Sequence, residues 1–292
     1  MIARGCTTRT ASGRLPAEFR YEGGWGASMA IKDILVLLDS SSETVGAYAL
    51  TCASALGAHL TAATLVFDPA GTVGFGEVPS SYLLSLLDEE TAAARELLKQ
   101  FSAAAQNAGV LAETEVIEVS FETPQEALGK FVRPFDVAMV EQPNPGVPSK
   151  GKLVIEAALF GSGRPVVVVP YIHKAPFSLK TVLVAWDGST VAARAIGDAM
   201  PFLEDAETVQ VVTIDDARHG EPDLPSLAIT RHLARHGIKA ELKTLSNAGD
   251  VASTLLSHAA DSSADLLVMG GYGHSRFREF VLGGATRASS RR

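Results

Sequence analysis

Two stretches of the chain have the same form: ILVLLDS at residues 34–40 and VLVAWDG at residues 182–188. Each is a short apolar run that ends in an aspartate followed by a small residue. A continuous apolar run of this length is typical of a strand buried on both faces of a parallel sheet. The aspartate and its small neighbour are typical of the turn into a helix. The sequence therefore begins the same strand–helix unit twice.

The rest of the chain extends the repeat. Helical stretches and second strands follow each apolar run, and later parts of the two halves also correspond. The expected elements are helices over 43–56 and 191–203, strands over 60–68 and 208–215, a long amphipathic helix over 80–109 with a shorter counterpart near 225–237, third strands over 113–119 and 239–245, fourth strands over 136–140 and 265–269, and a fifth strand over 164–170. Strands that alternate with helices predict an α/β fold with two doubly wound, Rossmann-like domains and parallel five-stranded sheets.

We place the domain boundaries by composition. Residues 1–28 are rich in Gly, Arg, Thr and Ser and lack the apolar core of a signal peptide, so we expect a disordered N-terminal extension, with Met29 as an alternative start. The first domain then covers 29–176, and the second covers 177–292. Only nine residues follow Gly283, too few for a closing helix and a fifth strand. The second domain is therefore expected to be C-terminally truncated and to lack its last strand.

Composition narrows the classes of function. The formal net charge is −8, which disfavours nucleic acid as a partner. Hydrophobic residues make up 47% of the chain and charged residues 20%, and no apolar stretch reaches the ~18 residues that span a bilayer. The two cysteines, Cys6 and Cys52, form no disulfide framework or metal motif, and Cys52 is expected to be a buried thiol. These features predict a cytoplasmic protein without a membrane partner.

The second half carries a glycine loop directly after its fourth strand. Residues 269–276 read MGGYGHSR, and Gly270, Gly273 and Gly283 have the spacing Gly-x2-Gly-x9-Gly. Glycines at the carboxyl end of a parallel strand let main-chain N–H groups approach and hold phosphate oxygens. If the first and fourth strands are neighbours, Asp187 faces the same crevice and can contact a base or ribose. Neither the dinucleotide fingerprint nor a Walker-type loop fits this stretch.

The strand order, the Asp187-Gly188-Ser189 turn and the glycine spacing together resemble the universal stress protein family, over about residues 30–287. The resemblance implies a tandem two-domain member that binds ATP, with or without Mg²⁺, in the second domain only. It implies that Asp187 and the main chain near Val212 and Thr213 contact the adenosine. The phosphate contacts implied by the resemblance fall on Gly270, Gly273 and Gly283. By their positions beside these glycines, His274, Gly284 and Thr286 are further candidate binding residues.

Two departures from the family pattern bear on the site. Gly284 stands where the family has Ser or Thr, so a hydroxyl contact to the phosphates is lost unless Thr286 replaces it. For His274 two alternatives stay open: it contacts a phosphate, or it faces solvent. In the first half, Glu141 and Asn144 replace the first two glycines. A carboxylate repels phosphate, so the first half is expected to be a non-binding pseudo-subunit. The resemblance also implies an intramolecular pseudo-dimer through fifth strands, and leaves a homodimer open.

We therefore expect a nucleotide-binding stress-response or signalling module without strong catalysis, since the sequence shows no nucleophile–base pair or metal cluster. Two alternatives remain open. One is an enzyme, a slow ATPase or a nucleotidyl transferase, an analogy at the level of the fold alone. The other is a nucleotide-free structural or interaction module in which the glycines only turn the chain and Asp187 only caps a helix.

Overall fold

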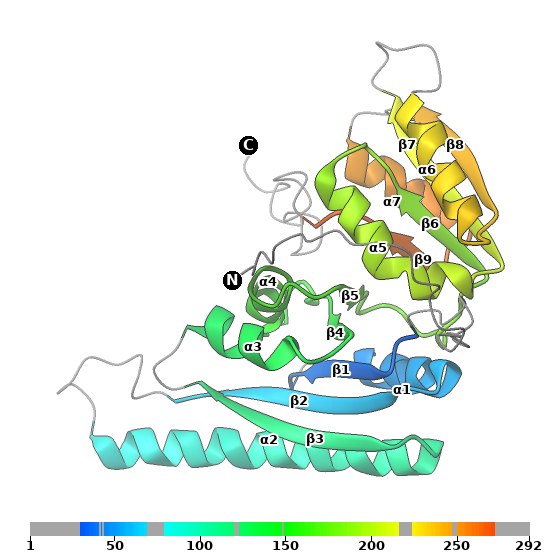
Figure 1. The fold of residues 1–292 in the computed structure, drawn as a ribbon. Helices are drawn as coiled ribbons and strands as arrows, with labels where there is room; N and C mark the ends of the chain where they lie inside the picture. The colour runs from blue at the N-terminus through cyan, green and yellow to red at the C-terminus, as the bar shows by residue number, and fades with distance from the viewer. Residues whose placement is uncertain are drawn as a thin grey trace, which may run out of the picture.

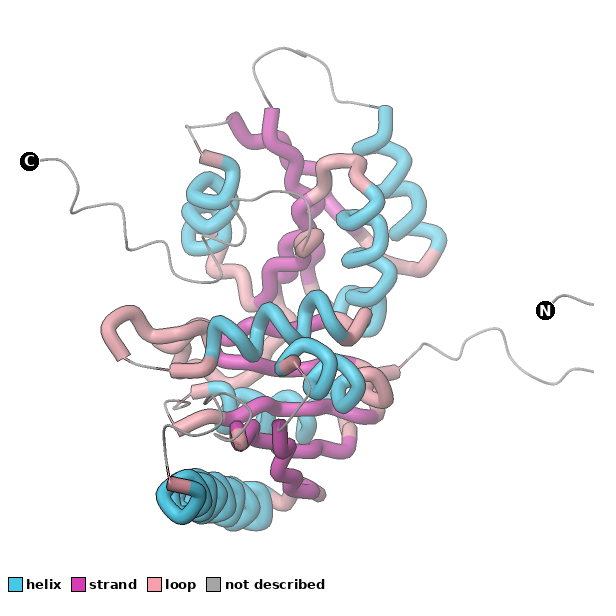
Figure 2. Tube along the Cα trace, turned by 90° about the vertical axis from the view of Figure 1, so that its left-hand side faces the viewer, coloured by secondary structure: helices cyan, strands magenta, loops and turns pink. Residues whose placement is uncertain are grey.

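A computed structural model of the chain describes residues 30–40, 42, 44–68, 79–119, 123–147, 149–215, 224–246 and 250–271. The described residues form two parallel sheets, each with helices on both faces (Figures 1 and 2). The predicted N-terminal extension and all residues after Gly271 lie outside the described residues.

The first sheet has five strands in the order β3-β2-β1-β4-β5. Its strands are β1 (Asp33–Leu38), β2 (His59–Phe67), β3 (Ala112–Val119), β4 (Val137–Glu141) and β5 (Val166–Val169). The helices between them are α1 (Val45–Leu56), α2 (Ser80–Ala108), α3 (Pro124–Val132) and α4 (Gly151–Gly161). The order reverses between β1 and β4, as in a doubly wound fold.

The second sheet repeats this plan with four strands among the described residues, in the order β8-β7-β6-β9. Its strands are β6 (Thr181–Ala185), β7 (Thr208–Asp215), β8 (Ala240–Ser246) and β9 (Leu266–Val268). The helices are α5 (Thr190–Glu204), α6 (Leu224–Arg235) and α7 (Val251–Asp261). The predicted fold class, including the smaller second sheet, is confirmed.

The alternation of side chains along the central strands divides each core into two layers. In β1, Ile34 and Val36 pack into a cluster with α1 and α2, while Leu35 and Leu37 pack into a cluster with α3 and α4. In β6, Val182 and Val184 face α5 and α6. On the opposite face of the second sheet, the cluster of buried residues is small: Leu183, Val212 and Leu255. Among the described residues, only α7 covers that face (Figure 2).

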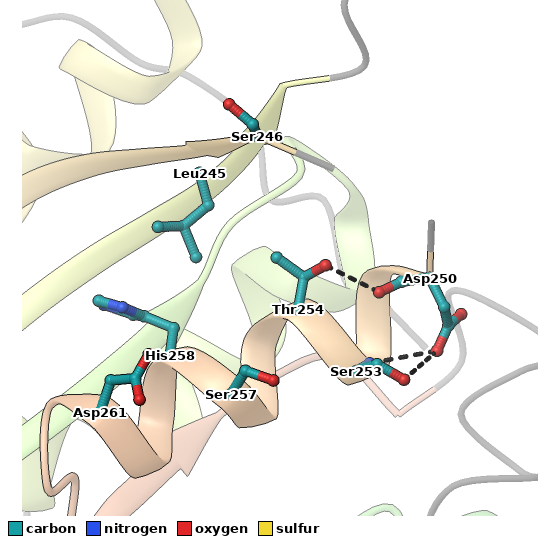
Figure 3. Close-up of a pocket in the computed structure, with 8 residues that line it drawn as sticks. All are labelled: Leu245, Ser246, Asp250, Ser253, Thr254, Ser257, His258 and Asp261. Carbon is teal, nitrogen blue, oxygen red and sulfur yellow. Dashed lines mark hydrogen bonds between the residues drawn. The ribbon is translucent and has the colours of Figure 1, made fainter. Parts of the chain in front are cut away.

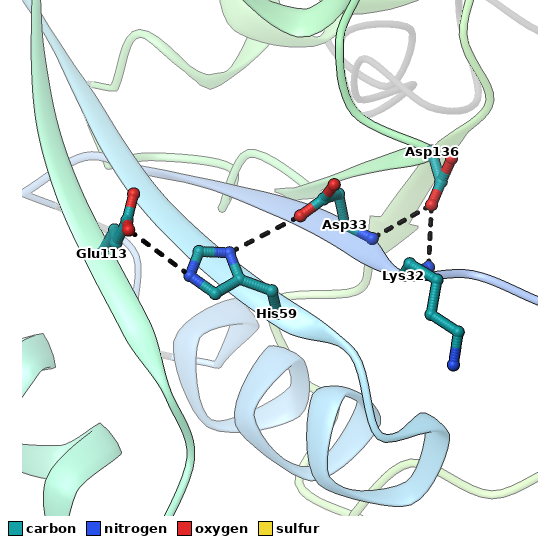
Figure 4. A network of polar contacts seen from close by, with 5 residues as sticks. All are labelled: Lys32, Asp33, His59, Glu113 and Asp136. Carbon is teal, nitrogen blue, oxygen red and sulfur yellow. Dashed lines mark hydrogen bonds and ion pairs between the residues drawn. The ribbon is translucent and has the colours of Figure 1, made fainter.

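An aspartate before each fourth strand fixes the amino end of the sheet, a role that sequence reasoning missed. Asp136 Oδ2 accepts hydrogen bonds from the Lys32 and Asp33 amides at 2.8 and 3.0 Å (Figure 4). Asp265 Oδ2 accepts one from the Thr181 amide at 2.9 Å. These carboxylates satisfy amides that begin β1 and β6, at the sheet edge opposite to the predicted nucleotide site.

The long helix α2 is amphipathic, but only its C-terminal half packs on the sheet. Ala94, Leu98 and Phe101 are buried, whereas Leu84, whose helical spacing puts it on the same face, is 61% exposed. The amino end of α2 extends past the strands, so the sheet offers it nothing to pack against (Figure 1). In the described part of the chain, no helix has the length and apolar character needed to cross a bilayer.

Cys52 is buried in α1, and burial raises the pKa of its thiol to about 12. The thiolate is the reactive form, so the folded protein should protect this residue. In a Cys6→Ser variant, we expect no reaction of Cys52 with Ellman's reagent at pH 8 until guanidinium unfolds the chain. Rapid labelling of the folded variant would contradict this assignment.

The same burial predicts a dependence of stability on pH. The pKa of Cys52 in the folded state lies above the ~8.5 of an unfolded chain. Its stabilising contribution is therefore complete below about pH 8.5 and is lost as the pH rises toward 12. A Cys52→Ala variant should therefore lose less stability at alkaline pH than the wild type. Urea unfolding at several pH values measures this difference.

Candidate functional site at the carboxyl edge of the second sheet

The two strands that lead into the predicted site are neighbours. β6 and β9 pair in parallel, with Val184 opposite Val268. Asp187 and Gly270 follow these strands within a few residues, at the point where the strand order reverses. In an open α/β sheet, ligands bind at this position. The topological condition that sequence reasoning set for Asp187 and the glycine loop is thus met.

Gly270 lies directly against the first turn of α5. A Cβ atom at this position would lie 2.8 Å from Val191 Cγ2, 2.9 Å from the Val191 carbonyl carbon and 3.0 Å from the Ala192 nitrogen. Contacts under 3.0 Å do not occur for real Cβ atoms, so any side chain here would force β9 and α5 apart. Close main-chain approach to the amino end of a helix requires glycine at this position.

Asp187 is exposed in the turn between β6 and α5. Its Oδ1 accepts a hydrogen bond from the Ser189 amide at 2.9 Å. The helix cap is Ser189, whose Oγ accepts from the Ala192 amide at 3.2 Å. The alternative in which Asp187 caps α5 is therefore wrong: Asp187 shapes the turn before the cap, and its carboxylate stands in solvent.

The two residues predicted on β7 lie beside this turn. The Val212 side chain is buried, and its carbonyl oxygen accepts from the Trp186 amide at 2.9 Å. Thr213 is half-buried, and its hydroxyl donates to the Thr244 hydroxyl at 3.3 Å. Only main-chain groups of Val212 can meet a ligand. The remaining predicted site residues lie outside the described part of the chain: Gly273, His274, Gly283, Gly284 and Thr286.

The first half fills the equivalent position with its own carboxylate. Glu141 ends β4 where Gly270 follows β9, next to the amino end of α1. Its Oε2 accepts hydrogen bonds from the Thr44 amide at 2.7 Å, the Thr44 hydroxyl at 2.9 Å and the Val45 amide at 2.9 Å. The Thr44 side chain itself does not cap the helix. Glu141 thus supplies an internal anion to the helix terminus.

Residues 178–291 match the model described as "Universal stress protein family". This match covers the second domain, which holds the glycine loop, and it agrees with the family that the sequence resembles. Comparison with curated proteins gave no significant match.

A solved universal stress protein has a similar fold. A universal stress protein from Archaeoglobus fulgidus DSM 4304 superposes with a TM-score of 0.63 at 19% identity, over 86% of this chain and 89% of the other. Because that match spans both halves, the first half also has the fold of this family. The two domains therefore form a tandem of universal stress protein folds.

Two further solved structures match about half of the chain. A universal stress protein in complex with cAMP has a TM-score of 0.35 at 21% identity, over 50% of this chain and 99% of the other. One from Archaeoglobus fulgidus in complex with dAMP has a TM-score of 0.33 at 15% identity, over 48% and 98%. These ligands belong to those proteins; likenesses this weak carry no ligand over to this chain.

A separate hollow of about 300 Å³ lies between α7 and the end of β8 in the second domain (Figure 3). Sequence reasoning named none of its lining residues. Some of its polar groups bond to one another: Ser253 Oγ donates to Asp250 Oδ2 at 3.0 Å, and the Thr254 hydroxyl donates to the Asp250 carbonyl at 2.9 Å. His258 pairs with Gln210 at 3.2 Å. The hollow reflects the thin cover on this face of the sheet.

In the described residues, no group of three or more His, Cys, Asp or Glu side chains is placed to hold a metal ion. His232, near the end of α6, and His236, just after it, have ring centroids 4.8 Å apart, and each directly follows an arginine, Arg231 or Arg235. Neighbouring positive charges disfavour a cation there.

Proposed function

We propose that the second domain binds ATP at the carboxyl edge of β6 and β9 and that the chain acts as a nucleotide-dependent stress-response module. The observation that carries this proposal is the bare main chain at Gly270, pressed against the amino end of α5. The amino end of a helix attracts anions through its unpaired N–H groups and its dipole. A glycine at this point keeps side chains away from the start of α5, where the Ala192 amide already donates to Ser189 Oγ.

The position of Asp187 supports placing the adenosine part of ATP beside β6. Its exposed carboxylate lies on the neighbouring strand end, in a turn fixed by the Ser189 amide. A carboxylate held this way can accept hydrogen bonds from a ribose hydroxyl or an adenine amino group. Phosphates would then lie toward residues 270–273, away from the negative charge of Asp187.

Glu141 supports restriction of binding to the second domain. In the first half, the amides at the start of α1 already bond to this carboxylate. A phosphate at the same place would have to displace it and would meet its charge. The first domain is thus proposed to be a non-binding pseudo-subunit.

Isothermal titration of the full chain with ATP tests the proposal. We expect saturable binding near one equivalent, and we expect Asp187→Ala to weaken it by about tenfold, the value of one net hydrogen bond to a charged group. Asp205→Ala is the matched control, because Asp205 is exposed at the far end of α5. No heat and no thermal stabilisation at millimolar ATP would favour a nucleotide-free module instead.

A further inference from the structure

The first domain contacts the start of the glycine loop through α4. The Leu159 side chain near the end of this helix lies on Gly271: a Cβ atom on Gly271 would lie 3.3 Å from both Leu159 Cδ atoms and 3.5 Å from Cγ. Real Cβ atoms rarely come so close, so only a bare α-carbon lets Leu159 sit in this place without adjustment. Leu159 is half-buried.

A second contact joins the same parts of the two domains. Arg194 on α5 donates from Nη2 to the Gly163 carbonyl at 2.9 Å. Gly163 follows α4 and has φ +74°, in the left-handed region that favours glycine. Leu159 and Gly163, at and just after the end of α4, therefore contact both elements that frame the proposed site. These elements are the first half of α5 and the chain just after β9.

The rest of α4 explains why Leu159 can be placed so firmly. Val154, Ile155 and Ala158 are buried against the first sheet. The α3–α4 crossing is also close, since a Cβ on Gly129 would lie 2.5 Å from the Gly161 carbonyl oxygen. The helix is thereby anchored on two sides, and a close-packed helix transmits a displacement rather than absorbing it.

Gly271 has no role in the glycine spacing of the phosphate loop, which uses Gly270, Gly273 and Gly283. The contact with Leu159 gives a separate reason why residue 271 is a glycine. We propose that Leu159 of the first domain is a positioning residue for the nucleotide loop of the second, so that the first domain sets the nucleotide affinity of its neighbour. This inference rests on the proposed function.

The test is ATP titration of full-length variants, with melting temperatures measured without nucleotide. We expect Leu159→Ala to weaken ATP binding about fivefold or more, the lower end of typical coupling between sites. Leu159→Met, which keeps a side chain of similar volume, should bind ATP within about twofold of the wild type. Leu111→Ala is the matched control, because Leu111 is 82% exposed before β3.

A double-mutant cycle separates positioning from general destabilisation. Gly271→Ala alone should weaken binding, because its methyl group crowds Leu159. In the Leu159→Ala background the same methyl group has room, so the double variant should bind ATP more tightly than the sum of the single effects predicts. A lower melting temperature with unchanged affinity in Leu159→Ala would overturn the inference while leaving the proposed function intact. A wild-type chain that binds no ATP would overturn both.

Discussion

Replacing Gly270 by alanine should abolish ATP binding and destabilise the second domain. The added methyl group would lie 2.8–3.0 Å from Val191 and the Ala192 amide, and two of these contacts are main-chain atoms that cannot rotate away. Overpacking of this kind typically costs about 1–3 kcal/mol. The strand end would also move away from α5, so the geometry at the helix terminus would be lost along with stability.

Gly197→Ala is the matched control for this prediction. Gly197 lies within α5, and a Cβ atom there would have no neighbour within 4 Å. Alanine in a helix is more favourable than glycine by about 1 kcal/mol, so this variant should be slightly more stable and bind ATP normally. ATP titration and urea unfolding of the two variants would decide. Normal ATP binding by Gly270→Ala would show that close approach at this glycine is not needed.

The second large effect is expected in the first domain. Glu141→Ala should lower its stability by about 1–3 kcal/mol, because the Thr44 and Val45 amides lose their acceptor. Glu141→Gln keeps one carbonyl oxygen as an acceptor, so it should lose less stability than Glu141→Ala. Hydrogen exchange at the start of α1, together with urea unfolding, measures both changes.

Glu115→Ala serves as the control for Glu141, since Glu115 is an exposed glutamate on β3. It should change stability by less than about 0.5 kcal/mol. Equal stability of Glu141→Ala and the wild type would mean that the carboxylate does not replace a helix cap, and the argument for a filled first site would lose its basis.

The strands were predictable because a buried parallel strand is a continuous run of apolar residues, which is visible in the local sequence. The runs at residues 34–38 and 182–186 are apolar at nearly every position, and both became the central strands of their sheets. The length of α2 was predictable from its periodicity. Its exposed Leu84 was not, because periodicity gives the face of a helix but not where the sheet beneath it ends.

The contacts that define the site were mostly not predictable, because they join residues far apart in the chain. Sequence reasoning recognised Glu141 as a poor neighbour for phosphate, yet its bonds to Thr44 and Val45 required the fold. The same holds for Leu159 on Gly271, which joins the two domains. Asp187 and Gly270 could be linked in advance only by assuming the strand order, which the sheet of β6 and β9 bears out.

A crystal structure of the full chain grown with ATP is the most direct test of nucleotide binding by the second domain. The account predicts one nucleotide, with its adenosine beside Asp187 and its phosphates on main-chain amides from Gly270 onward, and none beside Glu141. Nucleotide bound in the first domain, or bound in the hollow along α7 with the turn at Asp187 empty, would contradict it.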